Sequence, residues 1–190
     1  MELKQIEEEI TMELTKAMEE RRSIRAYKAG TQIEKSVIEE LIQAAQLAPS
    51  WKNSQTARYH IVLSEEKLTS VKEKCLPEFN RKNCQDAPAL IVTTFVKNRS
   101  GFERDGNPSN ELGNEWGAYD LGMQNQNLLL KAVELGLDTL VMGIRDAKAI
   151  REELSIPDDQ EVVSVLAVGY RNAEAEMPKR KEVEQIATFY

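Results

Sequence analysis

Three arginines and a serine lie within five residues near the start of the chain, in the stretch Arg21-Arg22-Ser23-Ile24-Arg25. A guanidinium group presents a planar set of donors that matches two phosphate oxygens at once, and it stays charged at any working pH. The cluster therefore suits a bound phosphomonoester. From these five residues alone, the alternative is that the arginines pair with glutamates such as Glu19 and Glu20 on the surface.

A second polar stretch is Ala48-Pro49-Ser50-Trp51-Lys52-Asn53-Ser54-Gln55, which leads directly into the strand-like residues 58–63. Its hydroxyl and amide side chains, those of Ser50, Asn53 and Gln55, can act as the hydrogen-bonding groups of a binding loop held between rigid flanks. A turn would have the same composition without any binding role.

The two cysteines and the single histidine do not form a recognisable catalytic or metal site. Cys75 and Cys84 are too few for a disulfide framework, and both are distant in sequence from His60. They offer neither the ligands of a zinc site nor a Cys–His nucleophile. We expect ordinary thiols, no metal, and a hydrogen-bonded structural histidine.

The composition favours one domain that binds a small molecule. The 190 residues are 41% hydrophobic, which is enough for one sizeable core. With 32 acidic and 25 basic residues the net charge is -7, so we expect no nucleic-acid or membrane-surface partner. No apolar run approaches the roughly 20 residues that span a bilayer, and no signal-peptide pattern is present. We therefore expect a cytoplasmic protein.

Apolar spacing predicts the helices that position the two polar stretches. A stripe over residues 2–20 predicts a first helix that ends at the arginine cluster; its apolar residues are Leu3, Ile6, Ile10, Leu14 and Met18. Thr31 and Glu34 have capping-box spacing and should open a second helix, which Pro49 ends. The longest periodic stretch, residues 116–135, predicts the core helix, with Gly136 as its C-cap.

The remaining segments predict a sheet with short helices around it. A short helix is expected over 64–74, and a helical turn over 150–154. The continuous apolar run within 89–96 indicates a buried central strand. Residues 97–113 are polar, contain glycine and have no periodicity, so they form either a mobile lid or a disordered excursion.

The arginine cluster after a helix, followed by Ala-Pro-Ser-x-x-Asn-x-Gln at the end of the next helix, resembles the opening of the FMN-dependent nitroreductase family. The segments 126–130 and 134–137 resemble the central helix of that family, 162–170 its last core strand and 179–186 its ending. The resemblance runs from about residue 20 to residue 190.

The resemblance implies an α+β fold with three α/β/α layers and a mixed, mainly antiparallel central sheet. We expect its strands near 58–63, 89–96, 138–143 and 161–170. The implied organisation is one nitroreductase-like domain over 1–190, with a lid or substrate loop at 97–115 and a C-terminal arm at 171–190. The family also implies a homodimer that exchanges its C-terminal tails.

Carried over to this sequence, the resemblance implies a phosphate site at one end of FMN, made by Arg21, Arg22, Ser23, Lys179, Arg180 and Lys181. Several cations can neutralise the nearly two negative charges of a phosphomonoester. Arg25 would lie near the pyrimidine edge of the flavin. A fixed cation there gives electrostatic support to reduction, because negative charge develops at that edge.

Two further segments are implied at the flavin ring. One is a loop contributed by the other subunit, with Pro49, Ser50, Trp51, Asn53 and Gln55. The other is the backbone of Leu140, Val141, Met142 and Gly143, where a glycine lets the main chain approach closely. The implied substrate-binding residues are Trp51, Phe102 and Trp116, each of which also suits a core position.

The resemblance thus implies an oxidoreductase that takes hydride from NADH or NADPH and passes electrons to a nitroaromatic, a quinone or a similar acceptor by a ping-pong mechanism. No side chain acts as a catalytic nucleophile, because FMN carries the chemistry. The alternatives are a flavin-binding protein without turnover, used for sensing or storage, and a dehalogenating or ene-reducing branch of the family. Thr56 in place of the usual proline, Trp51 and Lys52 in place of small residues, and Met142 in place of larger aromatics leave the acceptor open.

Overall fold

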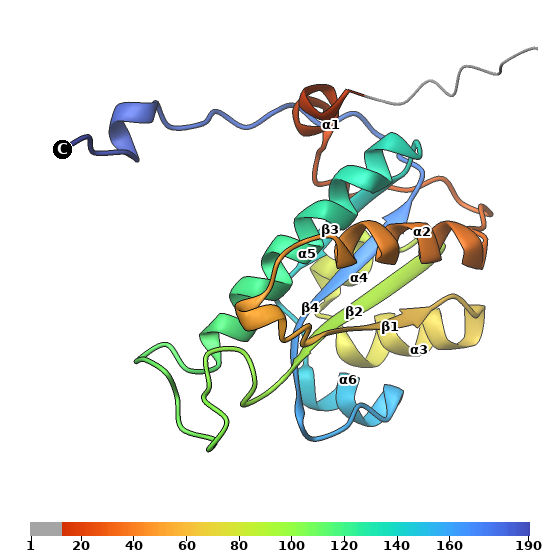
Figure 1. Ribbon diagram of the computed structural model, residues 1–190. Helices are drawn as coiled ribbons and strands as arrows, with labels where there is room; N and C mark the ends of the chain where they lie inside the picture. Colours follow the sequence, from red (N-terminus) through yellow and green to blue (C-terminus); the bar gives the residue numbers. More distant parts are fainter. Residues whose placement is uncertain (1–12) are drawn as a thin grey trace, which may run out of the picture.

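The structure, a computed structural model, describes residues 13–190 (Figure 1). The predicted stripe residues Leu3, Ile6 and Ile10 lie outside the described residues. The helices are α1 Leu14–Glu20, α2 Lys35–Gln46, α3 Glu65–Cys75, α4 Glu78–Asn83, α5 Glu115–Glu134 and α6 Ala147–Leu154, and the strands are β1 Ala57–Val62, β2 Ala89–Val96, β3 Asp138–Met142 and β4 Gln160–Gly169. Single 3-10 turns lie at Trp51–Asn53 and Val183–Gln185.

The four strands form one sheet in the order β1-β2-β4-β3, and each neighbouring pair is antiparallel. A parallel component comes from a single bridge between Ser23 and Thr139 at the β3 edge. β2 and β4 lie in the centre, where almost every residue is buried. The predicted α+β class and mainly antiparallel sheet are therefore confirmed, with strand bounds within about one residue of those expected.

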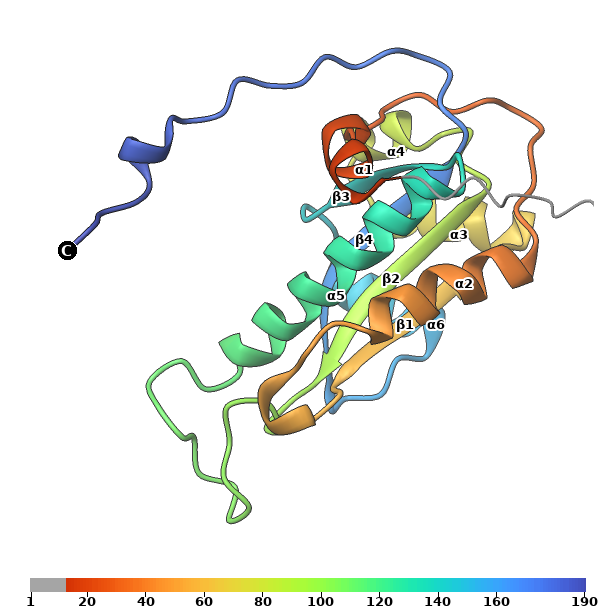
Figure 2. The ribbon, with the colours of Figure 1, turned by 45° about the horizontal axis from the view of Figure 1, so that its top comes forward.

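Helices cover both faces of the sheet, so the fold has three layers (Figures 1 and 2). Alternate residues of a strand point to opposite faces. Leu90 and Val92 of β2 pack in the core cluster that includes α3 and α6, whereas Ala89 and Ile91 pack in the cluster that includes α2 and α5. The continuous apolar run of β2 is explained by burial on both faces.

The core helix α5 is the longest element and lies next to α2 across one face of the sheet (Figure 2). Its predicted C-cap is confirmed, because Gly136 has φ 71° and the N–H of Leu137 bonds to the carbonyl of Ala132. Over the described residues, no helix is both long and apolar enough to cross a membrane.

Two local predictions were wrong or incomplete. Thr31 does not cap α2; its hydroxyl instead donates to the carbonyl of Lys28 in the preceding turn, and Glu34 is the N-cap without a side-chain bond. Hydroxyls compete for local backbone groups in turns, and that contact takes Thr31 out of the helix. Helix α4 was not predicted, because its six residues include only one apolar side chain, that of Phe79, and so show no apolar periodicity.

The C-terminal arm leaves the body next to β3 and extends away from it (Figures 1 and 2). Its base is fixed by Arg171, whose backbone N–H and guanidinium both donate to the buried carboxylate of Asp138 at 2.6 to 3.0 Å. This charged hydrogen bonding raises the pKa of Arg171. The arm is therefore attached rigidly at residue 171, although its later residues lie exposed.

Gly117 lets α5 approach the sheet closely. A Cβ atom at this position would lie 2.3 Å from the ring of Phe95, whereas a Cβ at Gly122 in the same helix would meet nothing within 4 Å. We expect Gly117→Ala to lower the free energy of unfolding by about 1–3 kcal/mol through overpacking. Gly122→Ala should raise it by roughly 0.5–1 kcal/mol, because alanine favours helix. Urea unfolding followed by circular dichroism checks both; equal stability of the two variants would contradict the tight contact.

Candidate functional site

The arginine-rich segment runs from the end of α1 along the start of β3. The N–H of Ile24 bonds to the carbonyl of Thr139 at 3.0 Å, and Ser23 forms the parallel bridge to the same residue. The Ile24 side chain is buried in the core. The backbone of the segment is therefore fixed, and the flanking arginines face outward beside the β3 edge.

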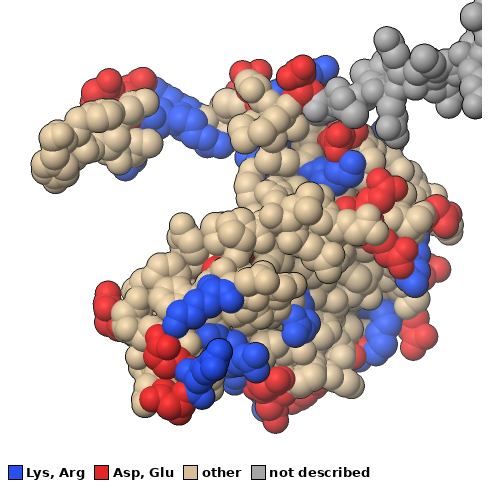
Figure 3. All heavy atoms as spheres, viewed as in Figure 1, with Lys and Arg blue, Asp and Glu red and all other residues tan. Residues whose placement is uncertain are grey.

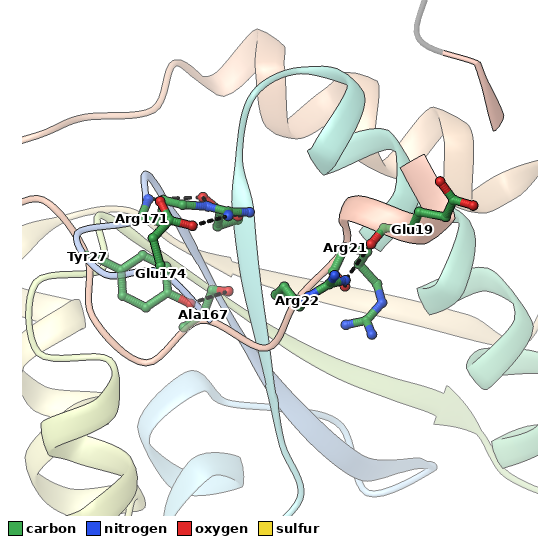
Figure 4. Close-up of polar contacts among 8 residues, drawn as sticks. Glu19, Arg21, Arg22, Tyr27, Ala167, Arg171 and Glu174 are labelled. Carbon is green, nitrogen blue, oxygen red and sulfur yellow. Dashed lines mark hydrogen bonds and ion pairs between the residues drawn. The ribbon is translucent and has the colours of Figure 1, made fainter. Parts of the chain in front are cut away.

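Arg22 has a structural role at the end of α1. Its Nη1 donates to the carbonyls of Glu19 and Arg21 (Figure 4), groups that have no partner within the helix. A cation also interacts favourably with the helix dipole at that end. Ion pairing with Glu19 or Glu20 carboxylates, the surface alternative for the cluster, is not found for Arg22; it bonds to backbone oxygens.

Arg21 is the half-buried member of the cluster, and its environment disfavours its charge. Burial lowers the pKa of the Arg21 guanidinium, and the charges of Arg180 and Arg22 lower it further. Among the described residues, its side chain has no hydrogen bond or ion pair; Figure 4 shows the guanidinium apart from the bonds that Arg22 makes. A partly desolvated cation beside two others is a favourable place for an anion.

The C-terminal arm supplies the third cation. Lys179, Arg180 and Lys181 are all exposed on the arm, and the space-filling view shows this basic stretch between the body and the arm's tip (Figure 3). Elsewhere on that face, Lys and Arg are interspersed with Asp and Glu. Arg180 is close enough for its charge to lower the pKa of Arg21; that the two residues hold one phosphate stays a prediction.

The end of β3 is open on the same side of the molecule. Leu140 and Met142 point into the core, but Val141 is 47% exposed and Ile144, just beyond the strand, is 65% exposed. A Cβ on Gly143 would meet nothing within 4 Å. Arg25, in the arginine-rich segment, is exposed, and its Nη1 lies 3.3 Å from the carbonyl oxygen of Ser23. Val141, Gly143 and Ile144 are therefore open to solvent at the end of the strand that Ser23 bridges.

The predicted binding loop, residues 49–55, lies near the other end of α5 (Figure 2). The N–H of Trp51 bonds to Asp120 in the N-terminal half of α5 at 2.9 Å, whereas α1 packs near Lys131 in its C-terminal half. The eleven residues from 120 to 131 correspond to about 16 Å of helix. One chain therefore does not bring this loop to its own arginine cluster.

The loop has an unusual backbone. Lys52, Asn53 and Gln55 have φ values of 45°, 54° and 50°. Left-handed backbone costs a residue with a side chain on the order of 1 kcal/mol, and such conformations concentrate where the surrounding structure imposes them. The Gln55 N–H also bonds to the Ser50 hydroxyl at 3.1 Å. The conformation of the loop is thus held by this bond within it and by the bond of Trp51 to Asp120 outside it.

Of the predicted substrate-binding residues, Trp51 and Trp116 pack on each other at this end. The rings of Trp51 and Trp116 are 4.8 Å apart at 49°. Phe102 follows Gly101, where an added Cβ would lie 2.7 Å from the Trp116 ring, and Phe102 itself forms a bridge with Pro108. The 97–113 segment is a sequence of bonded turns, such as Glu103 to Asn107 and Ser109 to Gly101. Trp51 and Trp116 thus form one aromatic pair, which offers apolar ring surface to an aromatic ligand.

Sequence reasoning missed three residues of this end: Ser100, Tyr119 and Asp120. Tyr119 is exposed and packs edge-on to Trp116 at 5.5 Å, while Ser100 and Asp120 are buried and bonded to each other. Asp120 precedes Leu121 on the apolar stripe of the core helix. A charged residue on a buried helix face is the sequence signal that could have found it.

The cysteines take no part in either cluster. Cys75 and Cys84 are free and buried in the core, and burial raises the pKa of each thiol to about 11. A thiol with such a pKa is a poor nucleophile at neutral pH. The prediction of ordinary thiols agrees with these surroundings.

Comparison with known proteins places the chain in one family. The family model described as the nitroreductase family matches residues 18–170. A protein of Archaeoglobus fulgidus, provisionally named NADH dehydrogenase/NAD(P)H nitroreductase, is 32% identical over 167 residues, which cover 83% of this chain and 85% of that protein.

Solved structures agree in fold. A nitroreductase family protein of Clostridium difficile 630 has a TM-score of 0.76 at 26% identity, with 94% of this chain and 98% of that chain covered. A protein of Exiguobacterium sibiricum 255-15, provisionally described as a nitroreductase and solved in complex with FMN, has a TM-score of 0.83 at 22% identity, with 94% and 98% covered. With the family model matching most of its length, this chain belongs to the nitroreductase family.

Proposed function

We propose that the protein is an FMN-dependent oxidoreductase that takes hydride from NADH or NADPH and passes the electrons to a nitroaromatic, a quinone or a similar small acceptor. The observation that carries the proposal is the group of three cations, Arg21, Arg22 and Arg180, beside the open end of β3. Membership of the nitroreductase family and the NAD(P)H-linked name of the Archaeoglobus relative support the reaction class.

The residues present fit the phosphate of FMN. The half-buried guanidinium of Arg21 has no partner among the described residues, and Arg22 keeps N–H groups beyond the Nη1 that it uses at α1. The phosphate would be held by Arg21, Arg22, Ser23 and Arg180, with Lys179 and Lys181 adding charge. A dianion there would remove the mutual repulsion of the arginines, so ligand and site stabilise each other.

The isoalloxazine ring of FMN would lie against Arg25 and the backbone of residues 140–143. When bound, FMN supplies two-electron hydride chemistry that no side chain of this site provides. Arg25 would support the negative charge at the pyrimidine edge, because a preorganised cation needs no rearrangement during the reaction. The backbone of Leu140, Val141, Met142 and Gly143 would lie along the ring, where Gly143 leaves space.

The proposed enzyme is a homodimer in which each flavin lies between two chains. In one chain the arginines and the 49–55 loop occupy opposite halves of α5, so the loop residues Pro49, Ser50, Trp51, Asn53 and Gln55 would meet the flavin of the other subunit. Each subunit would then contribute half of each site. Trp51, Phe102 and Trp116 would form the wall that contacts the acceptor.

The C-terminal arm supports this assembly. Its tip carries exposed apolar side chains, those of Val183, Ile186, Phe189 and Tyr190. A groove of about 1070 Å³ runs between α2 and the edge strand β1, and its apolar lining includes Ile38, Ile42, Ile61, Leu63 and Leu154. An unpaired strand edge next to an apolar groove accepts an extended segment. We assign the groove to the partner's tail.

The phosphate assignment predicts which variants lose FMN. Arg21→Met and Arg180→Met should each weaken FMN binding by ten- to a hundred-fold, or about 1.4–3 kcal/mol, because a charge-assisted contact is lost. Lys148→Met removes an exposed cation whose pair with Glu152 is 3.9 Å long, and it should leave the affinity unchanged. Titration of apoprotein with FMN, followed by flavin fluorescence, measures all three.

A second measurement separates binding from folding. Without FMN, Arg21→Met should unfold at the same urea concentration as wild type or slightly above it, because the substitution removes a charge that burial and two neighbouring cations disfavour. Solvent screening keeps the increase in the free energy of unfolding under about 1 kcal/mol. If both arginine variants bind FMN as wild type does, the phosphate lies elsewhere.

The proposed dimer predicts that removing the arm's apolar tip lowers the affinity for FMN even though the tip need not contact the flavin. A chain that ends at Glu182 keeps Lys179, Arg180 and Lys181 but lacks the apolar tip. We expect a weaker dimer and, in parallel, weaker FMN binding, because the two equilibria are linked. Sedimentation velocity over a range of concentrations, recorded at flavin and protein wavelengths, checks this. Full-length Glu184→Gln is the control for charge, and a monomer that retains FMN would rule out the shared site.

The reaction itself is tested by separating its two halves. NADH or NADPH alone should bleach the flavin absorbance of the holoprotein, and an acceptor added afterwards should restore it. If the nicotinamide and the acceptor bind in turn over one open face of the flavin, initial rates give parallel double-reciprocal lines. Phe102→Ala should then alter the half-reaction with the acceptor while the affinity for FMN stays the same. A panel of nitroaromatics, quinones, enones and halogenated phenols identifies the acceptor class. Bleaching without turnover on any acceptor would favour a sensing or storage protein, and intersecting lines would refute the ping-pong order.

A further inference from the structure

A buried carboxylate joins three segments of chain at the aromatic end of α5. Asp120 is 2% exposed, and its Oδ2 accepts the backbone N–H of Trp51 at 2.9 Å and the hydroxyl of Ser100 at 2.5 Å. The first donor belongs to the 49–55 loop and the second to the 97–113 segment. Both loops are therefore fixed to one atom of the core helix.

The direction of the hydrogen bonds extends this network by one residue. Ser100 has a single hydroxyl proton, and Asp120 accepts it. The contact of 2.7 Å between the hydroxyls of Ser54 and Ser100 therefore has Ser54 as its donor. The 49–55 loop is thus bonded to the network at both Trp51 and Ser54, on either side of its two consecutive left-handed residues, Lys52 and Asn53.

The loop needs such an anchor because its conformation is not favoured locally. Three of its residues have positive φ, and the Nε1 atom of Trp51 is buried without a hydrogen-bond partner among the described residues. Strained backbone persists only where its surroundings impose it. The exposed ion pair of Lys52 with Glu103 also joins the two loops, but exposed pairs contribute little. Charge-assisted bonds to a buried carboxylate are the stronger constraint.

The side chain that this anchor places is the Trp51 indole. Its ring packs on Trp116, which packs on the exposed Tyr119. We infer that Asp120 is a positioning residue: it binds the Trp51 N–H directly and reaches Ser54 through Ser100, and it so holds Trp51 in the acceptor-binding wall and sets how the enzyme fits its acceptor. The inference rests on the proposed function for the identity of the ligand, and on contacts within the chain for the positioning.

Kinetics of the FMN-loaded enzyme test the role. Ser100→Ala and Asp120→Ala should raise the KM for a nitroaromatic acceptor at least fivefold while kcat changes less than twofold, because the wall moves but the reacting ring stays in place. Asp120→Asn keeps an acceptor oxygen and should show a smaller rise. Ser164→Ala is the matched control, since Ser164 is a buried serine bonded to Thr93 in the sheet; it should destabilise the fold without changing KM.

A readout independent of activity distinguishes this inference from the proposed function. The chain has two tryptophans, and both are in the cluster, so all indole fluorescence reports on it. We expect acrylamide quenching of the full-length protein to increase at least twofold in Ser100→Ala and Asp120→Ala but not in Ser164→Ala. If the wild-type protein has no reductase activity but quenching still increases in both variants, the proposed function is refuted and the positioning role stands. Normal activity with unchanged KM and quenching in both variants would overturn the positioning role.

Discussion

The length and rigidity of α5 determine where everything else in this protein can be. Its 20 residues correspond to about 30 Å, and close packing at Gly117 under Phe95 holds the helix on the sheet. The helix carries Asp120 towards one end and the surface for α1 towards the other. The cationic cluster and the Trp51–Trp116 pair are consequently held at opposite halves of the helix.

Both ends contain arrangements that are unfavourable for the chain on its own. At one end, Arg21 lies beside two other guanidinium groups with no carboxylate partner among the described residues. At the other, consecutive residues adopt left-handed backbone. A sequence selected only for stability avoids both features, and local departures of this kind concentrate at functional sites. The core between them shows no such conflict: its two apolar clusters follow the alternation of the strands.

The sequence predicted the elements whose signal is internal to them. α5 and β2 were found almost to the residue because a long helical period and a continuous apolar run each report burial directly. Thr31 was misassigned because capping spacing also occurs in turns, where its hydroxyl finds a nearer carbonyl. The arginine cluster and the 49–55 loop were recognisable as motifs. Asp120 and Ser100 were not, because they are 20 residues apart and their contact exists only after α5 has packed.

The charge distribution has a consequence for how an anion arrives and leaves. The chain carries a net charge of -7, and acidic groups are spread over the face in Figure 3, whereas the cations that favour an anion are confined to one cluster. At physiological ionic strength, charges act over only about 8 Å. At lower ionic strength the screening length is longer, so a distant anion is repelled by the net charge of the molecule and is attracted only close to the arginines. Added salt therefore speeds its approach by screening the long-range repulsion, and shortens its residence by screening the arginines.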